Sequence, residues 1–282
     1  MKMRNFLYAI ILLICVIAIV LAVYFQFFDK KVIKEPTSNV ITLENIIEEE
    51  PIDNPKDVLA EFNKLFTNKF YDQKNLTKGV EKYEGLEDLD IVYTLNDGIV
   101  EQKDEEYDIN VNLPVINITS AANLNEKTQN MFADKITKIF NGTTKYTVYN
   151  IDYVAYLNDN ILSVVIKATL KEGNTAQKLM VKTYNYNIET NKEVSLNDIL
   201  EEQDISIRTV NDKIEQQVKE ASKQAETIAQ ATGQIIYKRD ITNSMYTTDK
   251  ADNFFIGKDG QIYIVSAYGN NNQTTEIDII KV

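Results

Sequence analysis

The sequence predicts an α+β protein: an antiparallel β-sheet with helices packed on one face, preceded by a single N-terminal transmembrane helix. Three observations lead to this prediction. Residues 6–28 form an uncharged apolar run. Long segments rich in Tyr, Val and Ile, joined by short turns, follow between residues 146 and 188. Helical patterns flank these segments without β-α-β alternation, and strands joined by short turns pair antiparallel with helices segregated to one side.

The apolar run reads FLYAIILLICVIAIVLAVYFQFF, and Gln26 is its one strongly polar side chain. As a helix it would be roughly 34 Å long, enough to cross a hydrocarbon core of about 30 Å. We expect a retained membrane anchor at residues 6–28, with residues 1–5 as a short cytoplasmic end. Two alternatives stay open: a cleaved signal peptide ending near Ala22, and lipid attachment at Cys15.

Flanking charge does not orient this anchor, because basic residues lie on both sides of it. The chain after the anchor contains no cysteine, which suits the outside of a Gram-positive cell. Residues 29–53 carry two prolines and the acidic run 48–50, whose self-repulsion favours an extended acidic tether. We therefore expect residues 54–282 to form a body on the extracytoplasmic side.

The N-terminal part of this body, residues 54–145, is expected to open with a helix. Asn54 is a good N-cap and Pro55 suits the first helical position. Apolar residues follow at helical spacing as far as Phe70, which indicates one buried face. The aromatic residues on this face are interpreted as core.

Strands are expected next. The Asn-Asp-Gly turn at residues 96–98 predicts a hairpin between residues 90–95 and the strand that begins at Ile99. An alternating strand at 107–113 then ends at Pro114. A second helix is expected from a Ser120 cap to Phe140, with Gly142 as its stop.

The C-terminal part of the body, residues 146–282, is expected to begin with a three-stranded meander. Its strands are predicted at 146–157, 161–170 and 178–188. Ser195 and Asp198 resemble a capping box that opens a short helix, and a long amphipathic helix is expected at 206–231. Three further strands are expected at 254–256, 261–268 and 275–280.

Composition excludes several kinds of chemistry. The chain has no His, so it cannot form Ser-His or Cys-His pairs or imidazole metal sites. Its net charge is −12, of which +2 precedes residue 29 and −4 lies in residues 29–55, leaving −10 on residues 56–282. Because an acidic body repels phosphate backbones, we expect no nucleic-acid partner. We also expect no cofactor, no metal site and no catalytic residues.

Carboxylates are the remaining candidates for catalysis. With 42 acidic residues in the chain, adjacent pairs are inevitable, so a solvated surface is the favoured interpretation. The alternating tyrosines of the meander could stack on sugars, but tyrosine also commonly fills half-exposed sheets, and packing is favoured. The paired acids are Asp88/Asp90, Glu105/Glu106 and Glu201/Glu202, and the tyrosines are Tyr146, Tyr149, Tyr153, Tyr156, Tyr184 and Tyr186.

The order of elements resembles a bacterial extracytoplasmic domain family of unknown function found in Firmicutes. The resemblance lies in TYNYNIETNKEVSLNDIL (183–200) and FFIGKDGQIYIVSAYGNNNQTTEIDII (254–280), with YDINVNLPVINI (107–118) similar to a segment that often precedes the domain. That family occurs outside the membrane in a lysozyme-sensing anti-sigma factor and ahead of the catalytic domain of a peptidoglycan deacetylase. This chain lacks the histidine-containing turn of many members, and the family implies no catalytic residues.

The leading interpretation is a membrane-anchored, extracytoplasmic and non-catalytic binding module of the cell envelope. A cationic, wall-directed protein such as lysozyme, or a cell-wall ligand, is the expected partner. A carboxylate-dependent envelope enzyme and a structural spacer are the alternatives. Loops on a rigid sheet usually carry recognition, so two loops are the candidate partner-binding sites. These are Lys171, Glu172, Gly173, Asn174 and Thr175, and Gly269, Asn270, Asn271, Asn272 and Gln273.

Overall fold

A computed structural model describes residues 54–104, 106–233, 236, 238–269 and 275–282. They belong to one compact unit, Pro51–Val282. The anchor and tether predicted at 6–28 and 29–53 lie outside the described residues. Among the helices that the structure does describe, none is long and apolar enough to cross a membrane.

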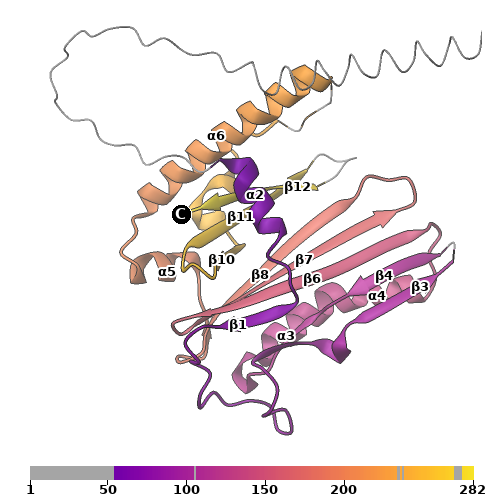
Figure 1. The fold of residues 1–282 in the computed structure, drawn as a ribbon. Coiled ribbons are helices and arrows are strands. Elements are labelled where there is room, and N and C mark those ends of the chain that lie inside the picture. Colours follow the sequence, from indigo (N-terminus) through magenta and orange to yellow (C-terminus); the bar gives the residue numbers. More distant parts are fainter. Residues whose placement is uncertain (1–53, 105, 234–235, 237, 270–274) are drawn as a thin grey trace, which may run out of the picture. The chain divides into compact units, whose positions relative to one another are not determined.

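The predicted meander forms the centre of a seven-stranded sheet (Figure 1). Its strands are β6 (Thr147–Asn158), β7 (Ile161–Glu172) and β8 (Lys178–Asn187), which pair antiparallel as expected. The short strand β9 (Lys192–Glu193) extends the sheet beyond β8. The sequence thus predicted each of the three long strands to within two residues at either end.

The other edge of β6 is parallel, so the expectation of a purely antiparallel sheet is wrong there. The strands β4 (Tyr107–Val111) and β1 (Lys69–Asp72) lie end to end along β6, pairing with residues 147–151 and 154–157. A parallel pair needs a long crossover connection, and the helical segment between β4 and β6 provides it. The strand β3 (Ile99–Lys103) pairs antiparallel with β4 at the sheet edge.

The hairpin predicted around residues 96–98 does not form. Asp97 and Gly98 do turn the chain with positive φ angles of 54° and 88°, after a short 3-10 helix η1 (Leu95–Asp97). However, β2 (Val92–Thr94) pairs with β5 (Pro114–Ile116) in a separate two-stranded sheet. The turn therefore joins strands of two different sheets, a choice that depends on long-range pairing.

The first helix, α2 (Pro55–Asn63), begins as predicted, because the Asn54 side chain accepts a hydrogen bond from the Lys56 N–H. It ends earlier than predicted. Asn68 has a φ of 56°, and Phe70 lies in β1, where its partner is Ala155 of β6. The pairing of the Phe70 backbone with the large sheet overrides its helical spacing.

The second helical segment has three parts: α3 (Ala122–Thr128), a π-helical stretch at Gln129–Ala133 and α4 (Asp134–Phe140). A 3-10 turn η2 (Thr119–Ala121) precedes it, and Ser120 is not its cap. Instead, the Ser120 hydroxyl donates to Asn191 Oδ1 at 2.7 Å and accepts from the Tyr186 hydroxyl. A tertiary contact thus replaces the predicted cap.

The C-terminal half follows the prediction closely. The capping box of Ser195 and Asp198 opens α5 (Leu196–Glu202), and Ser206 caps α6 (Ile207–Thr232). Two short 3-10 helices follow, η4 (Ser244–Tyr246) and η5 (Thr248–Lys250). The chain closes with a three-stranded antiparallel sheet of β10 (Phe254–Ile256), β11 (Ile262–Gly269) and β12 (Thr275–Lys281).

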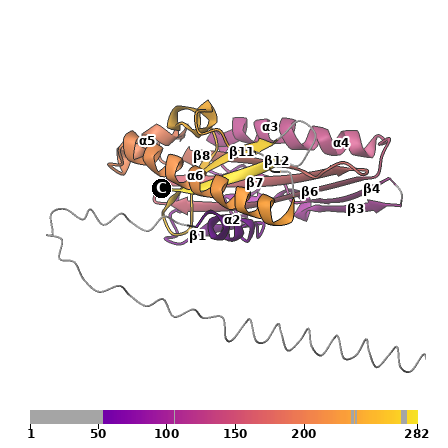
Figure 2. The ribbon, with the colours of Figure 1, turned by 90° about the horizontal axis from the view of Figure 1, so that it is seen from above.

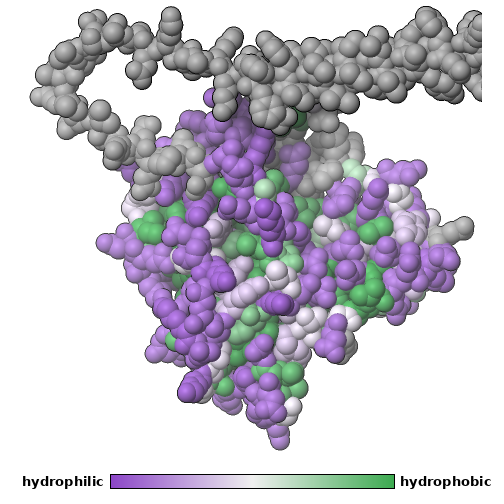
Figure 3. Space-filling model, viewed as in Figure 1, coloured by the Kyte–Doolittle hydropathy of each residue, from purple (hydrophilic) through white to green (hydrophobic). Residues whose placement is uncertain are grey.

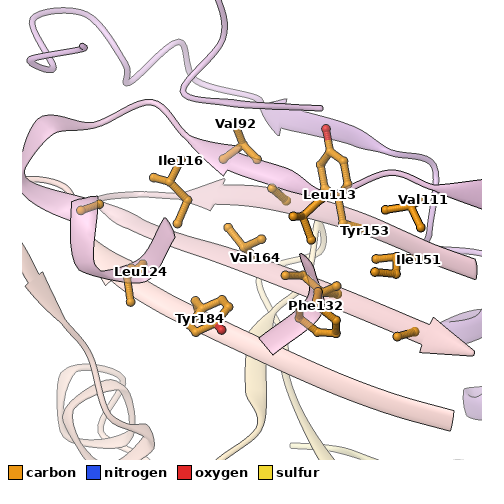
Figure 4. Packing of buried hydrophobic residues seen from close by; sticks show 14 of the residues in the cluster. Val92, Val111, Leu113, Ile116, Leu124, Phe132, Ile151, Tyr153, Val164 and Tyr184 are labelled. Atoms are coloured by element: carbon orange, nitrogen blue, oxygen red, sulfur yellow. The ribbon is translucent and has the colours of Figure 1, made fainter. Parts of the chain in front are cut away.

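The helices cover more than one face, contrary to the expectation. Leu124 and Phe132, from the helical segment α3–α4, point onto one face of the large sheet toward Val164 and Ile151 (Figure 4). The helix α2 lies on the opposite side of β6 and β7 (Figure 2) and packs there with the small sheet. Helices α5 and α6 cover the outer face of the small sheet. This second sheet adds an apolar face that needs its own helices, which the sequence pattern did not reveal.

Candidate binding surface

The first predicted loop is the turn between β7 and β8, and its backbone is well fixed. The Gly173 N–H donates to the Tyr146 carbonyl at 2.7 Å, which ties the turn to the start of β6. The Thr175 N–H and hydroxyl both donate to the Glu172 carbonyl, at 3.1 and 2.8 Å. Gly173 has a φ of 56°. The turn is therefore a defined platform at one end of the large sheet (Figure 1).

Strand alternation separates the charged residues of this loop. Glu172 lies opposite Thr147 in the sheet, and its carboxylate accepts a hydrogen bond of 2.9 Å from Lys135 Nζ of α4. Lys171 lies opposite Val148, one position along, so its side chain belongs to the other face. Of the predicted loop, Glu172 thus faces α4, while Asn174 and Thr175 are exposed at the tip.

A hollow of about 350 Å³ lies beside Glu172. It is formed by the last turns of α4, the segment that leads into β6, and the end of β7. Three lysines line it, together with small residues and one glutamate. The lining residues are Lys135, Lys138, Ile139, Gly142, Thr143, Thr144, Lys145, Thr147 and Glu172.

The charges around this hollow act on Glu172. The hydrogen bond from Lys135 holds the pKa of the Glu172 carboxyl below its usual value, and partial burial opposes that effect. The positive charges of Lys178 and Lys145 lower this pKa further. We call Lys135, Lys138, Lys145 and Lys178 the lysine cluster. Three of these lysines lower the pKa of the Glu172 carboxyl, in a chain whose net charge is −12.

Local sequence explains how the lysine cluster is presented. Lys135 and Lys138 are three residues apart on α4 and therefore share a helix face. Gly142, with a φ of 111°, turns the chain after the helix and leads it toward Lys145. Lys145 then packs on Gly173, where an added Cβ would lie 3.4 Å from Lys145 Cδ.

Sequence reasoning selected Glu172 and Gly173 but missed the lysine cluster. No short motif could have found it, because its members come from α4, the loop before β6, and β8. The second predicted loop is not placed by the structure. Gly269 pairs with Thr275 in the β11–β12 ladder, whereas Asn270, Asn271, Asn272 and Gln273 lie outside the described residues. The role of this second loop stays a prediction.

Five of the six tyrosines named for the meander are core residues, in agreement with the packing interpretation. Tyr149, Tyr153, Tyr156, Tyr184 and Tyr186 are each less than 7% exposed, whereas Tyr146 is 38% exposed. Burial raises the pKa of Tyr149 to about 12. The sheet therefore presents no row of these tyrosine rings to solvent for stacking on a sugar.

The paired acids are surface residues wherever the structure describes them. Asp88, Asp90, Glu201 and Glu202 are exposed, and Glu105 lies outside the described residues. Glu106 forms an ion pair with Lys103 at 2.7 Å. The described part of the chain contains no group of three or more His, Cys, Asp or Glu side chains placed to hold a metal ion.

We compared the chain with protein-family models, curated proteins and solved structures, and similarity was found to solved structures. No protein-family model matches the sequence, and no curated protein matches it. The solved structures to which this chain is similar include two DUF3298 family proteins. One, from Pseudomonas aeruginosa PAO1, has 10% identity and a TM-score of 0.42 over 67% of this chain and 89% of its own. The other, from Bacteroides fragilis, has 14% identity and a TM-score of 0.37 over 68% of this chain and 89% of its own. The resemblance to the Firmicutes ectodomain family stays a prediction.

Proposed function

We propose that residues 54–282 form a non-catalytic binding module on the outer side of the cell membrane, held there by residues 6–28. The module recognises a cell-wall component at the end of the large sheet where β7 turns into β8. The observation that supports this proposal is the hollow beside Glu172, lined by three lysines. Its volume lies in the range of about 300–1,000 Å³ that small-ligand sites occupy.

The elements around the hollow give it a fixed shape. Lys135 and Lys138 stand on α4, whose Ile136 and Ile139 are buried against the large sheet. Glu172 ends a strand of twelve residues that is paired on both sides. Sites built on helices and strands hold side chains more precisely than free loops do, so α4 and β7 fix the backbone positions of Lys135, Lys138 and Glu172.

A cationic, wall-directed protein such as lysozyme is the second candidate partner. The charge of −10 on residues 56–282 favours it, because such a charge steers basic proteins toward the body. The lysine cluster would repel such a partner at the β7–β8 turn. A cationic protein would therefore bind a different surface, and Figure 3 shows a face on which hydrophilic residues predominate between scattered apolar ones.

Co-sedimentation tests the proposal. The full-length protein, in nonionic detergent at about 0.15 M salt, is mixed with purified cell-wall sacculi, because charges separated by more than about 8 Å are screened there. We expect the protein to pellet with the sacculi and the double variant Lys138→Ala/Lys145→Ala to stay in solution. Lys64→Ala/Lys250→Ala is the matched control, since these lysines are also exposed but lie outside the hollow.

Two results would count against the wall-component proposal. One is equal sedimentation of the two double variants, which would mean that the cluster plays no part. The other is saturable binding to lysozyme, but not to another basic protein of similar size, combined with no binding to sacculi. The second result would make the cationic protein the partner. Absence of binding to either would leave the structural-spacer alternative.

A further inference from the structure

Glu172 occupies the lysine cluster as a built-in anion. Its carboxylate forms an ion pair of 2.9 Å with the Lys135 ammonium, and the positive charges of Lys145 and Lys178 also stabilise its ionised form. Its own side chain is 36% exposed, and that of Lys135 is 33% exposed. The hollow beside them is open to solvent and lined by Lys135, Lys138 and Lys145, so an external anion can approach these three lysines.

The cations of this cluster are all lysines. Among the described residues, Arg208 pairs with Asp212 and Arg239 with Asp278, both away from the hollow. Arginine forks match planar carboxylates bidentately, whereas lysine is a compact point charge with three rotatable donors. Several such point charges around a hollow suit a tetrahedral group whose charge is spread over its oxygens. A phosphate group has this geometry and carries about −1 to −2 at neutral pH.

We propose that the lysine cluster binds a phosphate group carried by the cell-wall component, and that Glu172 holds the site until this phosphate displaces it. The inference rests on the proposed function and names the chemical class of its ligand. Asp134, next to Lys135 on α4, does not line the hollow, and the Glu106 carboxylate is paired with Lys103. The Glu172 carboxylate is thus the acidic side chain that lines the hollow.

Competition between Glu172 and the ligand predicts the direction in which a substitution of Glu172 changes the affinity for phosphate. A bound phosphate must take Lys135 from Glu172 and then lie beside the displaced carboxylate. Replacing Glu172 by Gln removes that competing charge while keeping the size of the side chain. One unit charge about 4 Å away changes an anion's affinity by about fivefold where water screens the charge fully, and by more near a protein surface. Glu172→Gln should therefore bind phosphate more tightly than the unmodified protein.

Calorimetric titration of the full-length protein in nonionic detergent tests this inference, with tripolyphosphate as the probe and citrate as a carboxylate of comparable charge. At about 0.15 M salt we expect saturable binding of tripolyphosphate, tightened by Glu172→Gln and weakened about tenfold or more by Lys138→Ala/Lys145→Ala. Glu193→Gln is the matched control, because Glu193 forms a similar ion pair with Lys127 at 2.6 Å elsewhere. Lys64→Ala/Lys250→Ala controls for net charge.

The inference is overturned if citrate binds as tightly as tripolyphosphate, or if Glu193→Gln tightens binding as much as Glu172→Gln does. It is also overturned if tripolyphosphate does not bind. Melting curves for every variant confirm that each one is folded before titration. Failure of this inference can be told apart from failure of the proposed function. A protein that pellets with sacculi but does not bind tripolyphosphate would support the proposed function and contradict the phosphate ligand. A protein that binds tripolyphosphate but does not pellet with sacculi would keep the phosphate site and contradict the proposed function.

Discussion

The Ser163 hydroxyl donates a hydrogen bond of 2.7 Å to Asn185 Oδ1, and the two residues are direct partners across β7 and β8. Both are buried polar residues. Asn185 Nδ2 also donates to the Phe254 carbonyl at 2.8 Å, and Ser163 Oγ accepts from the Ile256 N–H at 3.1 Å. Side chains of the large sheet thereby satisfy the free edge of β10, where another strand would otherwise be needed.

Ser163→Ala should destabilise the body by about 1–3 kcal/mol, because it leaves the buried Ile256 N–H and one Asn185 lone pair without their partner. Urea denaturation measures the change. Thr169→Ala is the control, since it lies on the same face of β7 but is only partly buried. Equal decreases in the free energy of unfolding for the two variants would show that the hydrogen bond between Ser163 and the Ile256 N–H adds no measurable stability.

The buried ion pair of Arg239 and Asp278 should be far more sensitive than an exposed one. The guanidinium binds both carboxylate oxygens at 2.9–3.0 Å, the Tyr246 hydroxyl adds a third bond, and both charged side chains are at most 10% exposed. We expect Asp278→Ala to cost about 3–5 kcal/mol, because it removes the carboxylate that a buried guanidinium binds through both oxygens.

Asp212→Ala supplies the comparison for this prediction. Asp212 pairs with Arg208 on the exposed side of α6, where the Arg208 side chain is 91% exposed. Its loss should change the free energy of unfolding by about 0.5 kcal/mol or less. Thermal or urea melts of both variants measure the two changes. Similar stabilities for the two variants would contradict the prediction that the buried ion pair matters more than the exposed one.

The ionisation of Glu172 should report its ion pair with Lys135. The folded protein lowers the pKa of this carboxyl, so its contribution to stability is present above the pKa of the unfolded chain. That contribution is lost as the pH falls through the lower, folded value. A carboxyl NMR titration should show the Glu172 midpoint rising toward the usual value in Lys135→Met, while Lys64→Met leaves it unchanged. An unmoved midpoint in Lys135→Met would refute the assigned cause.

A fragment of residues 54–282 should fold without the predicted anchor. The capped start of α2 at Asn54 and the compactness of the unit that contains it motivate this expectation. The fragment should be monomeric and melt cooperatively, as measured by circular dichroism and sedimentation. Aggregation that is relieved only by restoring residues 6–28 in detergent would contradict it.

Elements set by nearby residues were predictable. The capping box of Ser195 and Asp198, the long helix that starts near residue 206 and the strands β6 to β8 all appear where the pattern placed them. Each depends on hydrogen bonds or burial periodicity within a few residues. The predicted ends of elements were wrong where a residue distant in sequence supplied a partner, as for Phe70 and Ser120.

The sequence by itself determined the α+β class and the three-stranded meander, because helical and strand periodicities are local properties of the chain. Only the tertiary structure decided that β1 and β4 run parallel to β6, that β10 rests on Ser163 and Asn185, and that helices cover several faces. It also decided that Lys135 pairs with Glu172 and that Lys145 packs on the neighbouring Gly173. These residues meet through strand pairing and helix packing across dozens of residues, and such long-range contacts leave no periodic trace in the sequence.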